Sequence, residues 1–181
     1  TVCWGEVRRA RGTGRVGASA GSDVDKSQGL GGSTGVCTAS AASRDNQVYW
    51  HLEPGRMVTT WYDTGYFSCH TDLRMSFQLI LTAVPGCSGA DGDFDVEFRY
   101  NRCEWETGDA SGGSGGLGGT PAQAGFDAGD STNFVAIMGS RMDGIRNVLC
   151  TESTVGETGI WLCPARGRTV RCSDACITSA T

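Results

Sequence analysis

Lysine is almost absent from this chain, in which Lys26 stands alone among 15 basic residues and the other 14 are arginines. The arginines are spread along the sequence, and 20 acidic residues bring the formal net charge to −5. Proteins that bind a phosphate backbone carry clustered basic residues. We therefore expect no nucleic-acid partner.

Long apolar runs are also missing. No stretch approaches the roughly 20 apolar residues of a transmembrane helix, and the chain opens at "TVCWGEV" with neither Met nor a signal-peptide core. These features predict a soluble, processed or trimmed chain. No N-x-S/T sequon occurs at any asparagine, so carbohydrate on this protein is expected to be O-linked to serine or threonine.

Cysteine is abundant, with nine residues dispersed over the chain instead of grouped in the paired hooks of a zinc ribbon. Cys172 and Cys176 form the single tight pair, and no second hook accompanies them. Dispersed cysteines indicate disulfides and an extracellular, secreted or cell-surface location. The odd number leaves one thiol buried or bonded to another molecule. The disulfide candidates are Cys3, Cys37, Cys69, Cys87, Cys103, Cys150, Cys163, Cys172 and Cys176.

Two-residue alternation predicts strands. In "FDVEFRY", residues 94, 96, 98 and 100 are apolar and the intervening ones are charged, which is typical of a half-buried antiparallel strand. The stretch 75–84 is apolar on both faces and predicts a central strand. The segments "QVYWHL" and "RMVTTWY" predict a hairpin across Glu53-Pro54-Gly55.

Further short strands are expected between clusters of Gly, Asp and Ser, near 5–9, 14–18, 121–126, 132–137, 145–150 and 158–163. Sustained helical spacing is absent, although 139–149 leaves room for one helical turn. Together these patterns predict an all-β fold, an antiparallel β-sandwich with long Gly-rich loops, disulfide staples and little helix.

The glycine-rich stretch "TGDASGGSGGLGGT" (107–120) separates the strand expected at 94–105 from that at 121–137, which are predicted to form a hairpin-like pair. Six glycines between 112 and 119 leave few side chains for chemistry. We interpret the stretch as a surface turn of the Ω type. It neither follows a buried parallel strand nor opens a helix, as a dinucleotide-binding loop would.

Catalytic signatures are weak. "GASAG" (17–21) matches G-x-S-x-G without the helix that follows a nucleophile elbow, and "GDASGG" (108–113) lacks the contexts of a serine protease. His70 could act as a general base paired with Asp72, but the sequence supplies no nucleophile beside them. We predict that the protein is not an enzyme.

Several acidic residues lie close together in the sequence and could form a calcium site. "DGDFDVE" has the D-x-D-x-D rhythm of a calcium loop, but lacks the glycine and the final glutamate of an EF-hand. Hard cations accept other clusters of oxygen ligands. No cofactor is predicted outright, and a calcium site is left open at Asp91, Asp93, Asp95, Asp127 and Asp130.

Five segments in order resemble the nidogen-like (NIDO) domain family, an extracellular module. They are "VTTWYDTGYF" (58–67), "SFQLILT" (76–82), "FRYNRCEWETG" (98–108), "AQAGFDAGDSTNF" (122–134) and "ESTVGETGIW" (152–161). In motif the chain looks most like the tectorin and exported bacterial versions. The resemblance implies that the glycine stretch is the family's variable loop and that Trp61, Phe77, Trp105, Phe126, Phe134 and Trp161 are core residues.

The resemblance also implies the disulfides Cys103–Cys150, Cys69–Cys87 and Cys3–Cys37, which leaves three cysteines near the C-terminus. Residues 1–163 are expected to form the domain, and 164–181 a cysteine-containing tail. The tail either closes a local hairpin or adds a strand to a neighbouring subunit. The candidates for that assembly contact are Val170, Cys172, Cys176 and Ile177.

Family members are non-enzymatic parts of matrices, mucus and cell surfaces. The resemblance therefore implies a structural or adhesive module that binds copies of itself or matrix proteins, and we favour assembly into a filament or matrix through sheet-edge and tail contacts. The alternative is a soluble binding module for a glycan or a calcium-bridged ligand, in which Trp4 or Trp50 could stack on sugar rings. An isolated copy of such a module is either a fragment or a dedicated building block.

Overall fold

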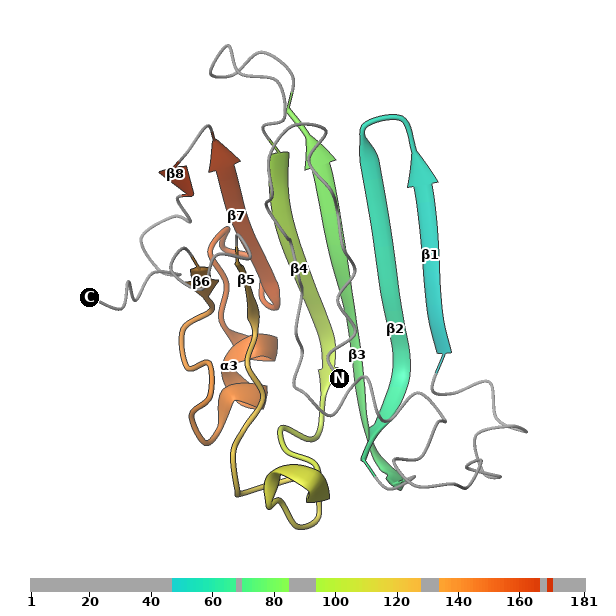
Figure 1. Ribbon diagram of the computed structural model, residues 1–181, viewed down its shortest axis with the longest axis vertical. Coiled ribbons are helices and arrows are strands. Elements are labelled where there is room, and N and C mark those ends of the chain that lie inside the picture. The colour runs from blue at the N-terminus through green and yellow to red at the C-terminus, as the bar shows by residue number, and fades with distance from the viewer. Residues whose placement is uncertain (1–46, 68–69, 85–93, 128–133, 167–168, 171–181) are drawn as a thin grey trace.

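The computed structural model describes residues 47–67, 70–84, 94–127, 134–166 and 169–170. Its main element is a six-stranded antiparallel sheet in the order β1-β2-β3-β4-β7-β8 (Figure 1). The strands are β1 (Gln47–Glu53), β2 (Arg56–Tyr66), β3 (His70–Ala83), β4 (Phe94–Cys103), β7 (Ile160–Arg166) and β8 (Thr169–Val170).

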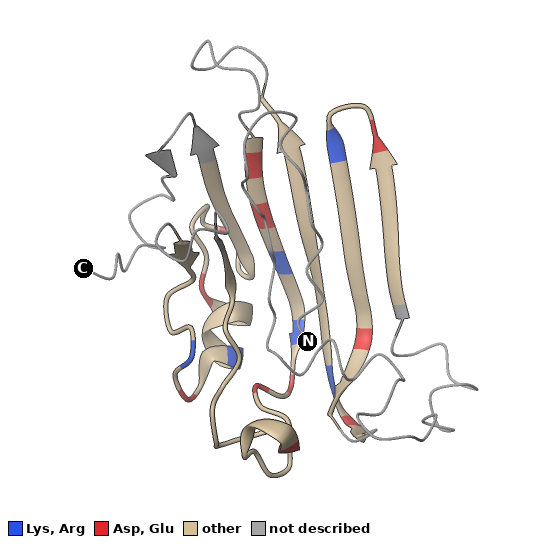
Figure 2. Cartoon of the chain, in the orientation of Figure 1, with Lys and Arg blue, Asp and Glu red and all other residues tan. Residues whose placement is uncertain are grey.

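A second, smaller layer contains a two-stranded sheet of β5 (Gly125–Asp127) and β6 (Phe134–Ala136) together with the helix α3 (Ile145–Thr151). In Figure 1 this layer lies on the side of β4 and β7, away from β1. The all-β class is thus confirmed, with antiparallel sheets and one short α-helix among the described residues. Charged residues are dispersed over the described part of the chain (Figure 2).

The core lies between these two layers. Residues directly opposite each other on neighbouring strands share a face of the sheet, and successive strands place Leu79, Phe98 and Trp161 side by side. Trp61 stacks on Phe77 with ring centroids 4.7 Å apart. Buried side chains of the second layer complete the core, namely Phe126, Ile137, Ile145 and Leu149.

Three local predictions are confirmed. The hairpin of β1 and β2 turns at Pro54-Gly55, with Glu53 opposite Arg56. β3 lies in the interior of the sheet between β2 and β4. β4 buries Val96, Phe98 and Tyr100 on one face, as its alternation predicted. The expected core position is confirmed for Trp61, Phe77 and Trp161 of the large sheet, and also for Trp105 and Phe126.

Three other expectations are wrong. Residues 145–150, expected as a strand, belong to α3, which buries Ile145 and Leu149 at helical spacing. β4 pairs with β3 and β7, and β5 pairs with β6, so the expected pairing of 94–105 with 121–137 does not form. Phe134, expected in the core, is 42% exposed. The strands expected at 5–9 and 14–18 lie outside the described residues.

The glycine-rich loop is an ordered turn that closes on itself. It contains the 3-10 helix η1 (Asp109–Ser111), and the amides of Glu106 and Thr107 both donate to the carbonyl of Gly116. Near the other end, the Thr120 amide donates to the carbonyl of Ser111. Closely spaced ends and internal packing are typical of an Ω loop.

Gly116 is expected to resist replacement in this loop. Its φ of +78° is a left-handed conformation, and an added Cβ would lie 2.8 Å from the Cβ of Trp105. We expect Gly116→Ala to lower the free energy of unfolding by about 2 to 4 kcal/mol, combining left-handed strain with overpacking. Gly115, with φ +60° and open space around it, is the control. Gly115→Ala should cost only about 1 to 2 kcal/mol in denaturant unfolding, and equal losses would contradict the packing assignment.

Candidate interaction surface

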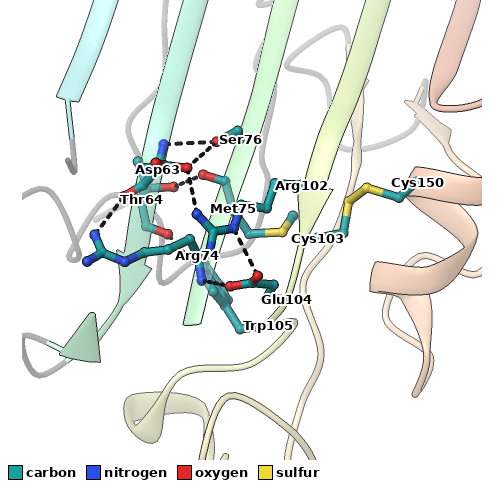
Figure 3. A network of polar contacts seen from close by, with 10 residues as sticks. All are labelled: Asp63, Thr64, Arg74, Met75, Ser76, Arg102, Cys103, Glu104, Trp105 and Cys150. Carbon is teal, nitrogen blue, oxygen red and sulfur yellow. Dashed lines mark hydrogen bonds and ion pairs between the residues drawn. A yellow bond between two sulfur atoms is a disulfide. The ribbon is translucent and has the colours of Figure 1, made fainter. Parts of the chain in front are cut away.

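A network of polar contacts surrounds the irregular part of β2 (Figure 3). Between Trp61 and Thr64 the register with β3 shifts by one residue, which is a β-bulge. Asp63 lies in this bulge with a left-handed φ of +46°, a conformation that aspartate tolerates better than most residues. Its amide donates to the Ser76 hydroxyl at 3.0 Å, and that hydroxyl donates back to Oδ1 of Asp63 at 2.9 Å.

Two arginines extend the network from the neighbouring strands. Arg102 donates from Nη1 to Oδ1 of Asp63 at 3.2 Å and from Nε to Oε1 of Glu104 at 2.9 Å. Arg74 donates from Nη1 to the Asp63 carbonyl, and its backbone amide donates to Oε2 of Glu104. The contacts tie β2, β3 and β4 together at the end where β4 leaves the sheet.

The ion pair in this network sets a pH dependence. The Arg102 hydrogen bond, more than the amide of Arg74, lowers the pKa of Glu104 below its ordinary value of 4.5. A lowered folded-state pKa contributes stability that is present above the unfolded-state value and is lost as the pH falls through the folded-state value. Because Glu104 is partly exposed, screening keeps this contribution small.

We expect Glu104→Gln to flatten the pH dependence of stability on the acid side. Between neutral pH and 4.5 the wild type should exceed the variant by a constant margin, and the margin should shrink below 4.5. Denaturant unfolding at a series of pH values measures this. The same substitution at exposed Glu157 is the control. A margin that grows on acidification would contradict the assignment.

The glycine-rich loop is attached to the sheet by side chains of the loop, of the sheet and of the segment between β4 and the loop. Trp105 is buried and donates from Nε1 to the carbonyl of Thr64 at 3.0 Å. His70 Nε2 lies 2.8 Å from Oδ2 of Asp109 in η1, and Tyr66 stacks on the His70 ring. The pairing of His70 with Asp72 that the sequence suggested therefore does not form. His70 contacts Asp109 instead, and Asp72 accepts a hydrogen bond from the Tyr66 hydroxyl.

Burial, followed by the Asp72 hydrogen bond, raises the pKa of Tyr66 to about 12. The phenol therefore stays protonated and remains a donor throughout the physiological pH range. This places Tyr66 among the side chains that hold the loop in position, and gives it no role as a base.

Glu106 is a buried carboxylate that positions α3. It is 5% exposed, and it accepts hydrogen bonds from the backbone amides of Gly144 at 3.0 Å and Arg146 at 3.2 Å. These amides belong to the first turn of the helix, whose amides have no intrahelical acceptor. A carboxylate at this position also interacts favourably with the positive end of the helix dipole. Glu106 thus connects the segment before the loop with the second layer.

One surface that is open for contact in the described part of the chain lies on β1. Val48, Trp50 and Leu52, here called the β1 stripe, are opposite Trp61, Thr59 and Met57 of β2, so they share the core-side face of the sheet. The second layer does not reach them, and Trp50 is 71% and Leu52 65% exposed. Among the described residues β1 pairs with β2 alone and forms an edge of the sheet.

The structure places a few of the predicted cysteines. Cys103 at the end of β4 and Cys150 in α3 form a disulfide with a Cα–Cα distance of 6.1 Å, the pair that the resemblance implied. Cys163 in β7 is buried and also disulfide-bonded. The other candidates, Cys3, Cys37, Cys69, Cys87, Cys172 and Cys176, lie outside the described residues.

Some of the candidate calcium ligands also lie in the described residues and others lie outside them. Asp95 lies in β4 and Asp127 ends β5, while Asp91, Asp93 and Asp130 lie outside the described residues. Within the described ranges, no group of three or more His, Cys, Asp or Glu side chains is arranged to hold a metal ion. No helix in that part of the chain has the length and apolar character to cross a membrane.

The tail candidates fall at the C-terminal end. Val170 lies in β8 and pairs with Ala165 of β7 in the same chain, whereas Cys172, Cys176 and Ile177 lie outside the described residues. β7 continues through position 164, where the tail was expected to begin.

Sequence reasoning missed the β1 stripe as a surface. The sequence alone suggests for Trp50 only a sugar-stacking role. The signal was present in "QVYWHLE", which alternates like a strand and holds no Lys, Arg or Pro to discourage pairing at its edge.

Comparisons with known proteins place this architecture in a family. Residues 39–164 match the nidogen-like domain, and the chain belongs to that family. Alpha-tectorin of mouse and of human are each 35% identical to it over 123 residues, and alpha-tectorin of chicken is 44% identical over 116 residues. These alignments cover 66% and 62% of this chain but only 5% of each alpha-tectorin. No solved structure matches the chain.

Proposed function

We propose that this chain is a non-enzymatic extracellular structural module that associates with copies of itself into a filament or matrix. Membership of the nidogen-like family and the similarity to alpha-tectorin support an extracellular structural role. The Cys103–Cys150 disulfide is consistent with an oxidising compartment. The polar clusters described above all hold backbone segments or loops in place, which is the work of a scaffold.

The observation that carries self-association is the open edge at β1. An edge strand presents unpaired amides and carbonyls that another strand can use. Natural edge strands are protected by charges, proline, bulges or short length, and β1 is seven residues long with continuous pairing to β2. The C-terminal tail, with Cys172 and Cys176, is the second proposed contact between copies.

Sedimentation equilibrium of the full chain in its oxidised form tests the proposal. The apparent mass should rise with protein concentration above the monomer mass of 19.0 kDa. Repeating the measurement on Cys172→Ser/Cys176→Ser separates tail disulfides from sheet contacts. A mass that stays monomeric over the whole concentration range, with the disulfides intact, would contradict self-association.

A further inference from the structure

The two edges of the six-stranded sheet differ in what they offer to another strand. β8 forms one edge and is two residues long, so it provides little backbone for pairing. β1 forms the other edge, with seven residues and no register shift against β2. Within the part of the chain that the structure describes, β1 is therefore the one long open edge.

Its side chains are those that sheet pairing favours. The β1 stripe presents Val48, Trp50 and Leu52 to solvent on one face, and Tyr49, on the other face, is 55% exposed. β1 carries one acidic residue, at its C-terminal end, and no Lys or Arg (Figure 2). That residue, Glu53, accepts a hydrogen bond from Arg56 of the same hairpin, which offsets its charge.

The sequence of β1 is complementary to itself in one orientation. When two copies pair antiparallel about Trp50, Val48 of each copy lies opposite Leu52 of the other, and the two Trp50 side chains meet at the centre. The opposite faces bring Tyr49 against His51. The two Glu53 carboxylates lie at opposite ends, whereas a parallel register would bring them together.

We propose that β1 is the self-association strand, and that two copies join antiparallel through it about a two-fold axis at Trp50 to make one continuous sheet. The partner is thus a second copy of this chain, and the contact is isologous, because the same strand serves both sides. This inference rests on the proposed self-association and specifies its surface and register. It leaves the opposite end of each molecule for the tail contact, so dimers could link into longer assemblies.

A lysine at the centre of the strand tests the surface. In the proposed register Trp50→Lys places two positive charges directly opposite each other and removes both indole rings. We expect the dissociation constant of the full chain, measured by sedimentation equilibrium, to rise about tenfold or more. Met142→Lys is the matched control, since Met142 is 65% exposed and precedes α3 in the second layer. It should leave the dissociation constant unchanged. Thermal unfolding checks that both variants fold.

A charge exchange tests the register. Val48→Glu and Leu52→Lys should each weaken association of the single variants with themselves. An equimolar mixture should recover it, because residue 48 of one copy lies opposite residue 52 of the other and unlike charges attract. The double variant Val48→Glu/Leu52→Lys should recover it without a partner variant.

Three results separate the claims. If the wild type associates and Trp50→Lys behaves like Met142→Lys, the β1 interface is wrong while self-association stands. If Trp50→Lys weakens association but the mixture fails to recover it, the antiparallel register is wrong. If the wild type remains monomeric at every concentration, the proposed self-association itself fails.

Discussion

Replacing Trp161 with alanine is expected to lower the free energy of unfolding by about 3 to 5 kcal/mol. The indole lies in β7 and is 0% exposed. Its Nε1 donates to the carbonyl of Leu149 at 3.1 Å, so the substitution opens a cavity and removes the donor for a buried carbonyl. Denaturant unfolding measures the loss.

Trp50→Ala is the control for this prediction, since it makes the same change at an exposed tryptophan. It should alter the stability of the monomer by no more than about 0.5 kcal/mol. Trp161→Phe keeps most of the ring and loses only the donor, so its cost should fall in between, at about 1 to 2 kcal/mol. Equal effects of Trp161→Ala and Trp50→Ala would contradict the description of the core.

Removing the Cys103–Cys150 disulfide is expected to have the other large effect. The bond closes a loop with a sequence separation of 47 residues, which contains the glycine-rich loop and the β5–β6 hairpin. For a loop of this length, the loss of constraint on the unfolded chain is worth about 4 kcal/mol, and measured losses are typically about 2 to 4 kcal/mol. The change in free energy of unfolding of Cys103→Ala/Cys150→Ala measures it.

The single variants distinguish a cross-link from ordinary packing. Either single substitution breaks the same bond, so each should cost nearly as much as the double substitution. Two independent packing contributions would instead add together. Additive losses in the single variants would contradict the assignment of the stability to the covalent bond.

The sequence predicted the elements whose structure is determined by residues within the element itself. The β1–β2 hairpin follows from Pro54-Gly55 between two strand-like segments, and the buried face of β4 follows from its alternation. The family resemblance added the disulfide between Cys103 and Cys150, which no local pattern specifies.

Elements that depend on distant contacts were not predictable in this way. α3 is only seven residues long, and its first turn is satisfied by Glu106, which lies 38 and 40 residues from the two amides it accepts. A short apolar segment cannot be divided between helix and strand by its periodicity alone. The partner of β4 was also missed, because sequence neighbours are favoured as sheet neighbours, whereas β7 occupies that place.

The β1 stripe also combines a property that is local in the sequence with properties that depend on distant contacts. Alternation in β1 predicted a strand, but whether that strand is an edge depends on the order of the whole sheet. The exposure of Trp50 depends in addition on how far the second layer extends over the sheet. Neither property is encoded within seven residues, so the β1 stripe is defined only by the folded chain.

The central claim is that this module assembles with itself, and the most direct test is the native size of the protein taken from its source. Negative-stain microscopy together with reducing and non-reducing gels measures it. The account predicts filaments or ordered arrays, with a ladder of disulfide-linked species if the tail joins copies. A homogeneous particle of about 19 kDa, unchanged by reduction, would contradict it.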